Sequence, residues 1–192
     1  MSEKKALFRL SGVTQLILAS ASPRRRQFLD DLGLPYQLLP SPKDEVRPYP
    51  DETPRAFTAR AAEHKARQVA KLIPESCATP LLIAADTVVS LNSRILGKPH
   101  DSADALAMLT MLSGRSHHVT TSVCVLLPRQ RQEDSFAFTD QACVTFYPWR
   151  KEVLAAYVET GEPLDKAGSY AIQGQGAFLI AEIQGSWSTV VG

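Results

Sequence analysis

Two serines, a proline and three consecutive arginines follow the apolar run at residues 16–19. Ser22 is a residue type that favours a helix N-cap, and Pro23 favours the first helical position. The first helical turn would then carry three cations beside the positive end of the helix dipole, which disfavours them: Arg24, Arg25 and Arg26. Guanidinium groups and backbone amides that converge on one place indicate a bound anion, most simply phosphate. The alternative is three solvated arginines on an exposed helix.

A second candidate is Asp86, a carboxylate placed directly after the apolar run at residues 81–85. Such a run predicts a buried strand, and α/β proteins bind ligands at the carboxyl ends of their strands. The small side chains of Ala84 and Ala85 leave room for a ligand to approach the acid. The alternative is a structural aspartate that accepts hydrogen bonds from nearby amides.

Two lysines are candidates for binding an anion. Lys65 lies on the apolar stripe of a helix predicted over residues 54–73, between Ala61 and Val69 at helical spacing. A lysine that faces the core needs an anionic partner, because an unpaired buried ammonium is very costly. The alternative is that its stem lies along the core while its ammonium reaches water. Lys98 stands in a turn between a glycine and a proline, where lysines are common.

The glycine-rich segment at residues 168–176 could bring its backbone close to a flat ligand. Within it, Gln173 offers an amide donor and acceptor that can pair with the edge of a nucleobase. The alternative is an ordinary glycine-rich hairpin. The sequence contains neither a Walker A lysine loop nor a GxGxxG segment after a strand, so the common nucleotide-binding loops are excluded.

Predicted helices and strands alternate along the chain, which indicates a mixed α/β fold. Strands are predicted at residues 15–20, 36–39, 81–85, 119–127 and 136–147. Helices are predicted at residues 23–32, 54–73, 149–159 and between Asp101 and Gly114. A hairpin is predicted around Asn92 and Ser93. The residues after Gly161 are predicted to be strand and loop. His117 and His118 open a predicted strand and so point to opposite faces, and they are assigned no role.

The composition limits the classes of function. The chain has 192 residues, 44% of them hydrophobic and 21% charged, and its formal net charge is +1. A protein that binds nucleic acid through phosphate contacts usually has a clear basic excess, so this class is not expected. The sequence has no apolar run long enough to cross a membrane. Its cysteines lack CxxC spacing, which argues against a zinc site or a disulfide framework and favours a reducing cytoplasm: Cys77, Cys124 and Cys143.

The candidate segments occur in the order found in one family. Five of them resemble the motifs of the Maf family of nucleoside triphosphate pyrophosphatases, also called septum formation inhibitors: residues 20–25, 65–66, 85–87, 97–99 and 162–174. The resemblance implies a mixed twisted sheet with flanking helices and two lobes around a central cleft, as in Maf and ITPase-like proteins. It runs over residues 15–192, which would form one domain after an N-terminal extension at residues 1–14. The family's last helix, which follows a Leu-Pro-Leu segment, would be missing.

Within that family, the chain resembles the dTTP/UTP pyrophosphatase branch at three positions that bear on substrate choice: Arg24, Thr87 and Gln173. A related branch that acts on 7-methyl-GTP carries bulkier or acidic residues there. The family's proton acceptor matches Asp86. Its phosphate-binding residues match Ser20, Arg24, Arg25, Lys65 and Lys98. An acid in the loop before the long helix matches Glu45, although the surrounding loop diverges.

The implied reaction is hydrolysis of dTTP, UTP or modified pyrimidine nucleotides to the monophosphate and pyrophosphate, in a house-cleaning role. Water would attack the α-phosphorus, and Asp86 would accept its proton. Mg²⁺ or Mn²⁺ held by Asp86 and Glu45 would lower the pKa of that water. The resemblance implies a cytoplasmic enzyme that forms a homodimer, with no nucleic-acid or membrane partner. Two alternatives stay open: a 7-methyl-GTP pyrophosphatase, and a non-catalytic regulator of septum formation that senses nucleotides.

Overall fold

The computed structural model describes residues 8–42, 46–128 and 134–192. Its strands are β1 (Gln15–Leu18), β2 (Gln37–Leu38), β3 (Pro80–Leu91), β4 (Arg94–Leu96), β5 (Ser116–Leu127), β6 (Asp134–Phe146) and β7 (Ile180–Gln184). Its α-helices are α1 (Pro23–Leu32), α2 (Pro54–Ala70), α3 (Ser102–Leu112), α4 (Lys151–Glu159) and α5 (Trp187–Val191). Short 3-10 helices are η1 (Glu162–Asp165), η2 (Ala167–Ser169) and η3 (Gln175–Leu179). No helix in these described ranges is both long enough and apolar enough to span a membrane.

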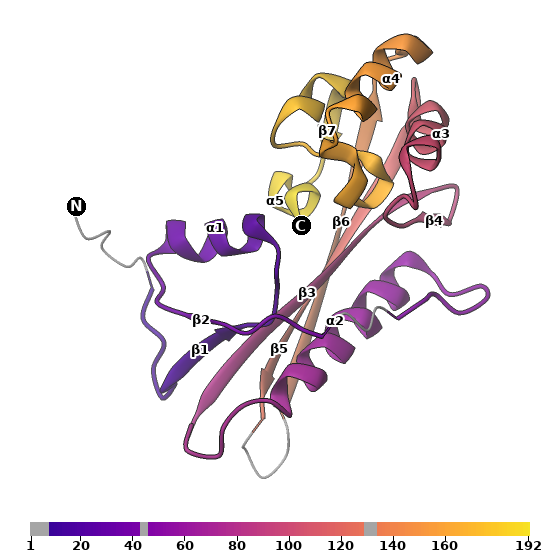
Figure 1. The fold of residues 1–192 in the computed structure, drawn as a ribbon. Coiled ribbons are helices and arrows are strands. Elements are labelled where there is room, and N and C mark those ends of the chain that lie inside the picture. Colours follow the sequence, from indigo (N-terminus) through magenta and orange to yellow (C-terminus); the bar gives the residue numbers. More distant parts are fainter. Residues whose placement is uncertain (1–7, 43–45, 129–133) are drawn as a thin grey trace. The chain divides into compact units, whose positions relative to one another are not determined.

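Across the described residues, seven strands form one hydrogen-bonded sheet in the order β2-β1-β3-β5-β6-β7, with β4 paired to β3 (Figure 1). Strand β1 pairs in parallel with both β2 and β3. The pairs β3–β4 and β6–β7 are antiparallel. The mixed α/β fold predicted from the sequence is therefore confirmed. The predicted cleft between two lobes stays a prediction.

The chain divides into two compact units. Unit 1 consists of residues 1–51, 59–86 and 122–138, and unit 2 consists of residues 52–58, 87–121 and 139–192. The elements α2, β3, β5 and β6 contribute residues to both units. The candidate residues Ser20, Lys65 and Asp86 fall in unit 1, whereas Lys98 and Gln173 fall in unit 2.

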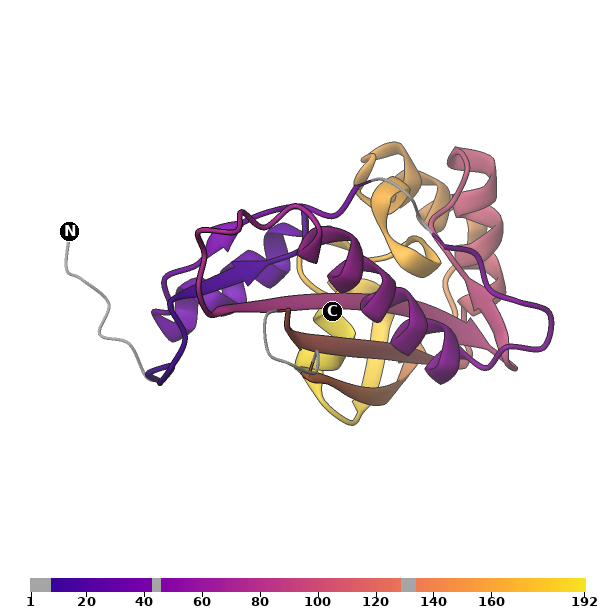
Figure 2. The same ribbon diagram turned by 90° about the horizontal axis from the view of Figure 1, so that it is seen from below.

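In unit 1, two helices pack on opposite faces of the paired strands β1 and β3 (Figure 2). Leu16 and Leu18 of β1 pack in a cluster with Leu29 of α1. Ile17 and Ala19 pack instead in the cluster that contains the buried face of α2. Successive side chains of a strand point to opposite faces, so one continuous apolar run forms the core of both layers.

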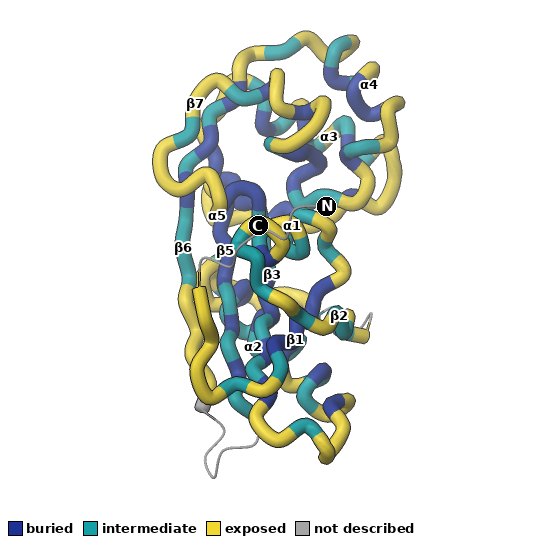
Figure 3. The backbone as a smooth tube through the Cα atoms, turned by 90° about the vertical axis from the view of Figure 1, so that its left-hand side faces the viewer, coloured by how far each residue is buried: buried dark blue, intermediate teal, exposed yellow. Residues whose placement is uncertain are grey.

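The register of β1 and β3 determines which residues meet where β1 ends. Leu18 pairs with Ile83, and the N–H of Ala19 donates to the carbonyl of Ile83 at 2.8 Å. This register brings the serine loop after β1 alongside Ala85 and Asp86. Strand β3 continues beyond that point with no exposed residue along its length (Figure 3). The carboxyl end of β1 is therefore a place where an α/β sheet can bind a ligand.

Helix α1 begins as the sequence predicts, but its first turn is capped differently. Ser22 has an extended backbone and Pro23 takes the first helical position, yet the Ser22 side chain makes no capping hydrogen bond. Instead the N–H of Ser22 donates to the Ser20 hydroxyl oxygen at 3.1 Å. The helix ends at Gly33, whose φ of 68° is the left-handed conformation that glycine adopts easily.

The strand predicted at residues 81–85, with Asp86 directly after it, is too short, because β3 runs on to Leu91 and Asp86 lies within it. The other predicted elements differ from the structure mainly at their ends. Helix α2 stops at Ala70 rather than at residue 73, because Pro74 disfavours helical backbone in the residue before it. The hairpin is confirmed, with positive φ angles of 49° at Asn92 and 67° at Ser93. The prediction of only strand and loop after Gly161 is wrong, since this part contains η1, η2, η3 and α5. Helices this short depend on tertiary contacts more than on their own sequence.

His117 is a buried titratable side chain in the core of unit 2, with 1% of its surface exposed. Its Nε2 lies 2.8 Å from the Tyr170 hydroxyl, and its ring contacts the edge of Phe146 at 4.9 Å between centroids. Burial lowers the pKa of His117 to about 4, and the charge of His118 adds to this effect while the Arg115 backbone opposes it. As predicted, the next residue, His118, is exposed.

This buried histidine predicts a loss of stability in acid. Between pH 6.5 and about 4 the unfolded chain binds a proton on His117 that the folded chain does not, so the free energy of unfolding falls as the pH falls. The full loss is about 3 kcal/mol. Urea unfolding at a series of pH values should show a shallower loss for His117→Gln. The control His118→Gln should follow the wild type, and an unchanged slope in His117→Gln would contradict the assignment.

Candidate functional site

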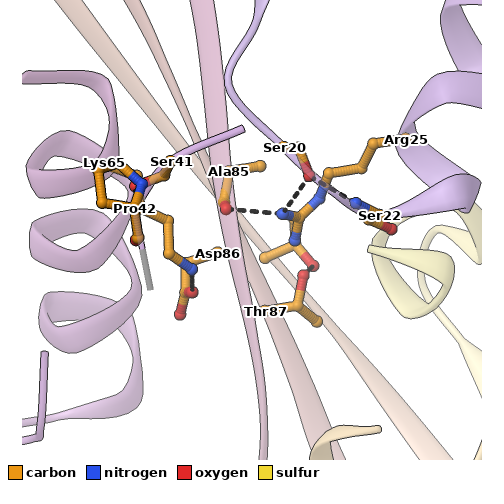
Figure 4. A network of polar contacts seen from close by, with 10 residues as sticks. Ser20, Ser22, Arg25, Ser41, Pro42, Lys65, Ala85, Asp86 and Thr87 are labelled. Carbon is orange, nitrogen blue, oxygen red and sulfur yellow. Dashed lines mark hydrogen bonds and ion pairs between the residues drawn. The ribbon is translucent and has the colours of Figure 1, made fainter. Parts of the chain in front are cut away.

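Arg25 connects the first turn of α1 to the end of the β1–β3 pair. Its Nη1 donates to the Ala85 carbonyl at 2.7 Å and to the Ser20 hydroxyl oxygen at 3.4 Å (Figure 4). Burial lowers the pKa of Arg25 to about 10, the charge of Asp86 opposes that shift, and the charge of Arg24 adds to it. Arg25 therefore stays a cation at neutral pH, within electrostatic reach of both Asp86 and Arg24.

Ser20 is a buried serine whose oxygen accepts two hydrogen bonds. One comes from the Ser22 N–H and the other from Arg25. A hydroxyl that accepts both bonds still has one hydrogen to donate. That hydrogen suits an anionic oxygen, so the geometry is compatible with the phosphate-binding role predicted for Ser20.

Lys65 and Asp86 form an ion pair between Nζ and Oδ1 in unit 1 (Figure 4). Their side chains are 22% and 14% exposed, so the pair is largely shielded from water. The prediction that Lys65 faces inward and needs an anionic partner is borne out by this contact, and the partner is Asp86. The two sequence candidates thus neutralise each other, and a bound polyanion would compete with Asp86 for the ammonium.

Thr87 begins a chain of hydroxyl contacts within unit 2. Its Oγ1 lies 3.0 Å from Oγ1 of Thr121, and the Thr121 hydroxyl donates to the carbonyl of Thr189 at 2.8 Å. Because Thr121 spends its single hydrogen on that carbonyl, Thr87 must be the donor in the contact between the two threonines.

Lys98 and Gln173 are both exposed side chains of unit 2. The turn that carries Lys98 is joined to η2 by a hydrogen bond from the Gly168 N–H to the Gly97 carbonyl at 3.0 Å. Gly168 has a φ of 66°, and a Cβ there would lie 2.7 Å from Val89. Glycine at this position therefore allows the loop to approach β3 closely.

The structure brings four candidates together at one place in unit 1: Ser20, Arg25, Lys65 and Asp86. Arg24 lies beside them in the first turn of α1. The convergence of Thr87, Lys98 and Gln173 on the same ligand stays a prediction. Glu45 lies outside the described residues. Among the residues that are described, no group of three or more His, Cys, Asp or Glu side chains is arranged to hold a metal ion.

Sequence reasoning missed two parts of this arrangement. The Ala85 carbonyl that receives Arg25 is a backbone atom, and no side-chain pattern reports it. Thr121 lies in a β-branched, apolar run, where threonine is an ordinary strand residue. A signal for Thr121 would have been its place on the strand next to Thr87, which requires the strand order to be known.

Comparison with known proteins gives a consistent result. A family model described as Maf-like protein matches residues 15–192. The chain is 48% identical over 177 residues to a protein of Nitratidesulfovibrio vulgaris named dTTP/UTP pyrophosphatase, covering 92% of this chain and 81% of that protein. Proteins with the same name are 48% identical in Desulfotalea psychrophila (92% and 87% covered) and 44% identical in Burkholderia pseudomallei (91% and 86% covered).

The ion pair predicts energetic coupling between Lys65 and Asp86. Lys65→Met leaves a shielded carboxylate without its partner and should lower the free energy of unfolding by roughly 1–3 kcal/mol. Asp86→Asn in the Lys65→Met background should restore part of that loss. Urea unfolding of the two single variants and the double variant measures the coupling.

The matched control is the exposed pair Glu63–Arg67 on the same helix. The same cycle with Arg67→Met and Glu63→Gln should give a coupling within about 0.5 kcal/mol, because exposed ion pairs contribute little. A Lys65–Asp86 coupling no larger than this control value would show that the pair is incidental.

Proposed function

The chain belongs to the Maf family, and we propose that it hydrolyses dTTP and UTP to the nucleoside monophosphate and pyrophosphate. Relatives named dTTP/UTP pyrophosphatase, 44% to 48% identical over most of the chain, support this proposal. One structural observation carries it. Beyond the carboxyl end of β1, Lys65 contacts the carboxylate of Asp86, while Arg25 from a separate segment binds the neighbouring Ala85 carbonyl within electrostatic reach of that carboxylate.

The barrier to hydrolysis of a triphosphate is mainly one of charge and position. The enzyme must hold the phosphates and neutralise the pyrophosphate that leaves. Arg24 and Arg25 lie in the first turn of α1, where the amides and the helix dipole also favour an anion. Lys65 supplies a further charge in unit 1. The family resemblance also assigns Lys98 to phosphate binding.

Asp86 is proposed to accept the proton of the attacking water. In the structure its Oδ1 contacts the Lys65 ammonium. A triphosphate that draws Lys65 toward its own oxygens would leave the carboxylate available to that water. A carboxylate is a weak base for bulk water, so the reaction requires a water that is more acidic than usual.

A divalent cation can meet this requirement. Mg²⁺ is commonly bound through one or two carboxylates together with substrate phosphates, and the single carboxylate of Asp86 fits such a site. Glu45 is proposed as a second ligand. When bound, Mg²⁺ or Mn²⁺ would lower the pKa of the attacking water.

Base recognition is proposed to involve Thr87 and Gln173. The Thr87 hydroxyl donates to Thr121, so it can accept a hydrogen bond from the imide N–H that uracil and thymine share. Cytosine has a ring acceptor at that position, which would oppose the Thr87 oxygen. A hydrogen bond donated by the base to Thr87 therefore favours dTTP and UTP over cytosine nucleotides. We also propose that the protein acts in the cytoplasm, where its cysteine thiols would stay reduced.

Asp86→Asn should lower turnover of UTP by about 10²–10⁴-fold, the contribution typical of a positioned general base. The exposed α2 variant Glu63→Gln should retain wild-type turnover. The assay follows pyrophosphate and inorganic phosphate separately, with Mg²⁺ and with Mn²⁺. Wild-type turnover in Asp86→Asn would remove Asp86 from the mechanism, and inorganic phosphate as the first product would place the attack at the γ-phosphorus. A parallel arm with 7-methyl-GTP tests the other branch.

Lys65→Ala should weaken binding of a triphosphate more than that of a monophosphate. If Lys65 contacts the outer phosphates, the Kd of a UTP analogue should rise about tenfold, equivalent to about 1.4 kcal/mol, while the Kd of UMP changes little. Calorimetric titration measures both constants, and Arg67→Ala is the control from the same helix. Equal effects on the two ligands would mean that Lys65 does not contact the outer phosphates.

A further inference from the structure

Glu162, at the start of η1, accepts three hydrogen bonds in unit 2. The Tyr157 hydroxyl donates to its Oε2 at 2.7 Å. The N–H groups of Gln175 and Gly176 donate to its two oxygens at 3.0 and 2.8 Å. One carboxylate therefore connects α4 to the first turn of η3.

The same pair also holds the other side of the Gln173 loop. The N–H of Ala171 donates to the Tyr157 hydroxyl oxygen at 3.3 Å. Gln173 thus lies between two backbone points, Ala171 and Gln175, that are both attached to the phenol–carboxylate pair. The Gln173 side chain itself is exposed, so its own packing does not fix its position.

Two glycines allow the backbone to come this close. A Cβ on Gly174 would lie 2.1 Å from Oε1 of Glu162, and the φ of 116° at Gly174 strains other residues as well. A Cβ on Gly176 would lie 2.3 Å from the Tyr157 hydroxyl. The sequence suggested that these glycines give room to a ligand. In the structure they give room to Glu162 and Tyr157.

The electrostatics of the pair agree with a permanent carboxylate. Burial alone would raise the pKa of Glu162, but hydrogen bonds from Tyr157, Gly176 and Gln175 and the charge of Lys166 outweigh it and lower that pKa. Burial and the hydrogen bond to Glu162 raise the pKa of Tyr157, which keeps the phenol protonated as a donor. Near neutral pH the donors and acceptors of this network therefore stay matched.

We propose that Glu162 and Tyr157 are positioning residues for base recognition, which hold the backbone on both sides of Gln173 so that its amide meets the pyrimidine edge in a fixed place. The inference rests on the proposed function. A long, exposed glutamine on a glycine-rich loop would otherwise lose much conformational freedom on binding. Anchoring the loop beforehand removes part of that entropic cost. The anchoring should therefore strengthen binding of the correct base and leave the rate of bond cleavage unchanged.

The test compares Glu162→Gln with a control variant, Glu159→Gln. Glu159 is exposed at the end of α4, and its substitution removes the same charge. Steady-state kinetics with UTP and CTP give kcat and KM for each variant, with Gln173→Ala as the reference for lost base recognition. Glu162→Gln should reduce the preference for UTP over CTP about tenfold, mainly through a higher KM for UTP, as Gln173→Ala does. Glu159→Gln should keep the wild-type preference.

Three outcomes would overturn the inference while leaving triphosphate hydrolysis intact: an unchanged preference in Glu162→Gln, an equal fall of kcat on both nucleotides, or a wild-type enzyme that does not distinguish UTP from CTP. If Glu162→Gln does not fold, Tyr157→Phe replaces it, because this substitution removes only the hydroxyl. Tyr157→Phe should show the same reduced preference for UTP over CTP.

A readout without turnover separates this inference from the proposed function. If the wild type releases no pyrophosphate from UTP or dTTP, the proposed function has failed. Hydrogen exchange of the backbone amides at residues 171–176 then tests the anchoring alone. Faster exchange in Glu162→Gln than in Glu159→Gln supports it, and equal exchange overturns it.

Discussion

The ion pair between Lys65 and Asp86 is the interaction on which the rest of the site depends. Each of these side chains is largely shielded from water, and each would be costly there without the other. The pair keeps a carboxylate and a cation side by side at the carboxyl end of β1, with Arg25 in electrostatic reach. In the proposed mechanism, a polyanion that takes over the Lys65 ammonium also releases the Asp86 carboxylate, so that substrate binding would make the proposed base available.

The fold supplies this arrangement through the two faces of β1 and β3. Alternate residues of one apolar run hold α1 on one face and α2 on the other. Helix α1 carries Arg25 and α2 carries Lys65, so the strands that separate the helices bring Lys65 to Asp86 and Arg25 to the adjacent Ala85 carbonyl. In unit 2, the Glu162 carboxylate likewise connects separate segments. It binds the backbone after Gln173 directly and the backbone before it through the Tyr157 hydroxyl.

Much of this could be predicted from the sequence because the signals were local. The serine–proline start of α1 and the inward stripe position of Lys65 each follow from short-range patterns. The predicted strand end at Asp86 is wrong, because β3 continues to Leu91. What could not be predicted depends on contacts between distant segments. The pairing of Lys65 with Asp86 requires the register of α2 against β3, and the glycines at 174 and 176 face side chains rather than a ligand only because η1 folds back on η3.

The most direct measurement is a crystal structure with a UTP analogue whose α- and β-phosphates are bridged by nitrogen, so that it binds but is not cleaved. The proposed mechanism predicts that the Lys65 ammonium leaves Asp86 and lies within hydrogen-bond distance of a phosphate oxygen, with the Asp86 carboxylate turned toward the α-phosphorus. A complex in which Lys65 still contacts Asp86 while the phosphates bind elsewhere would contradict it.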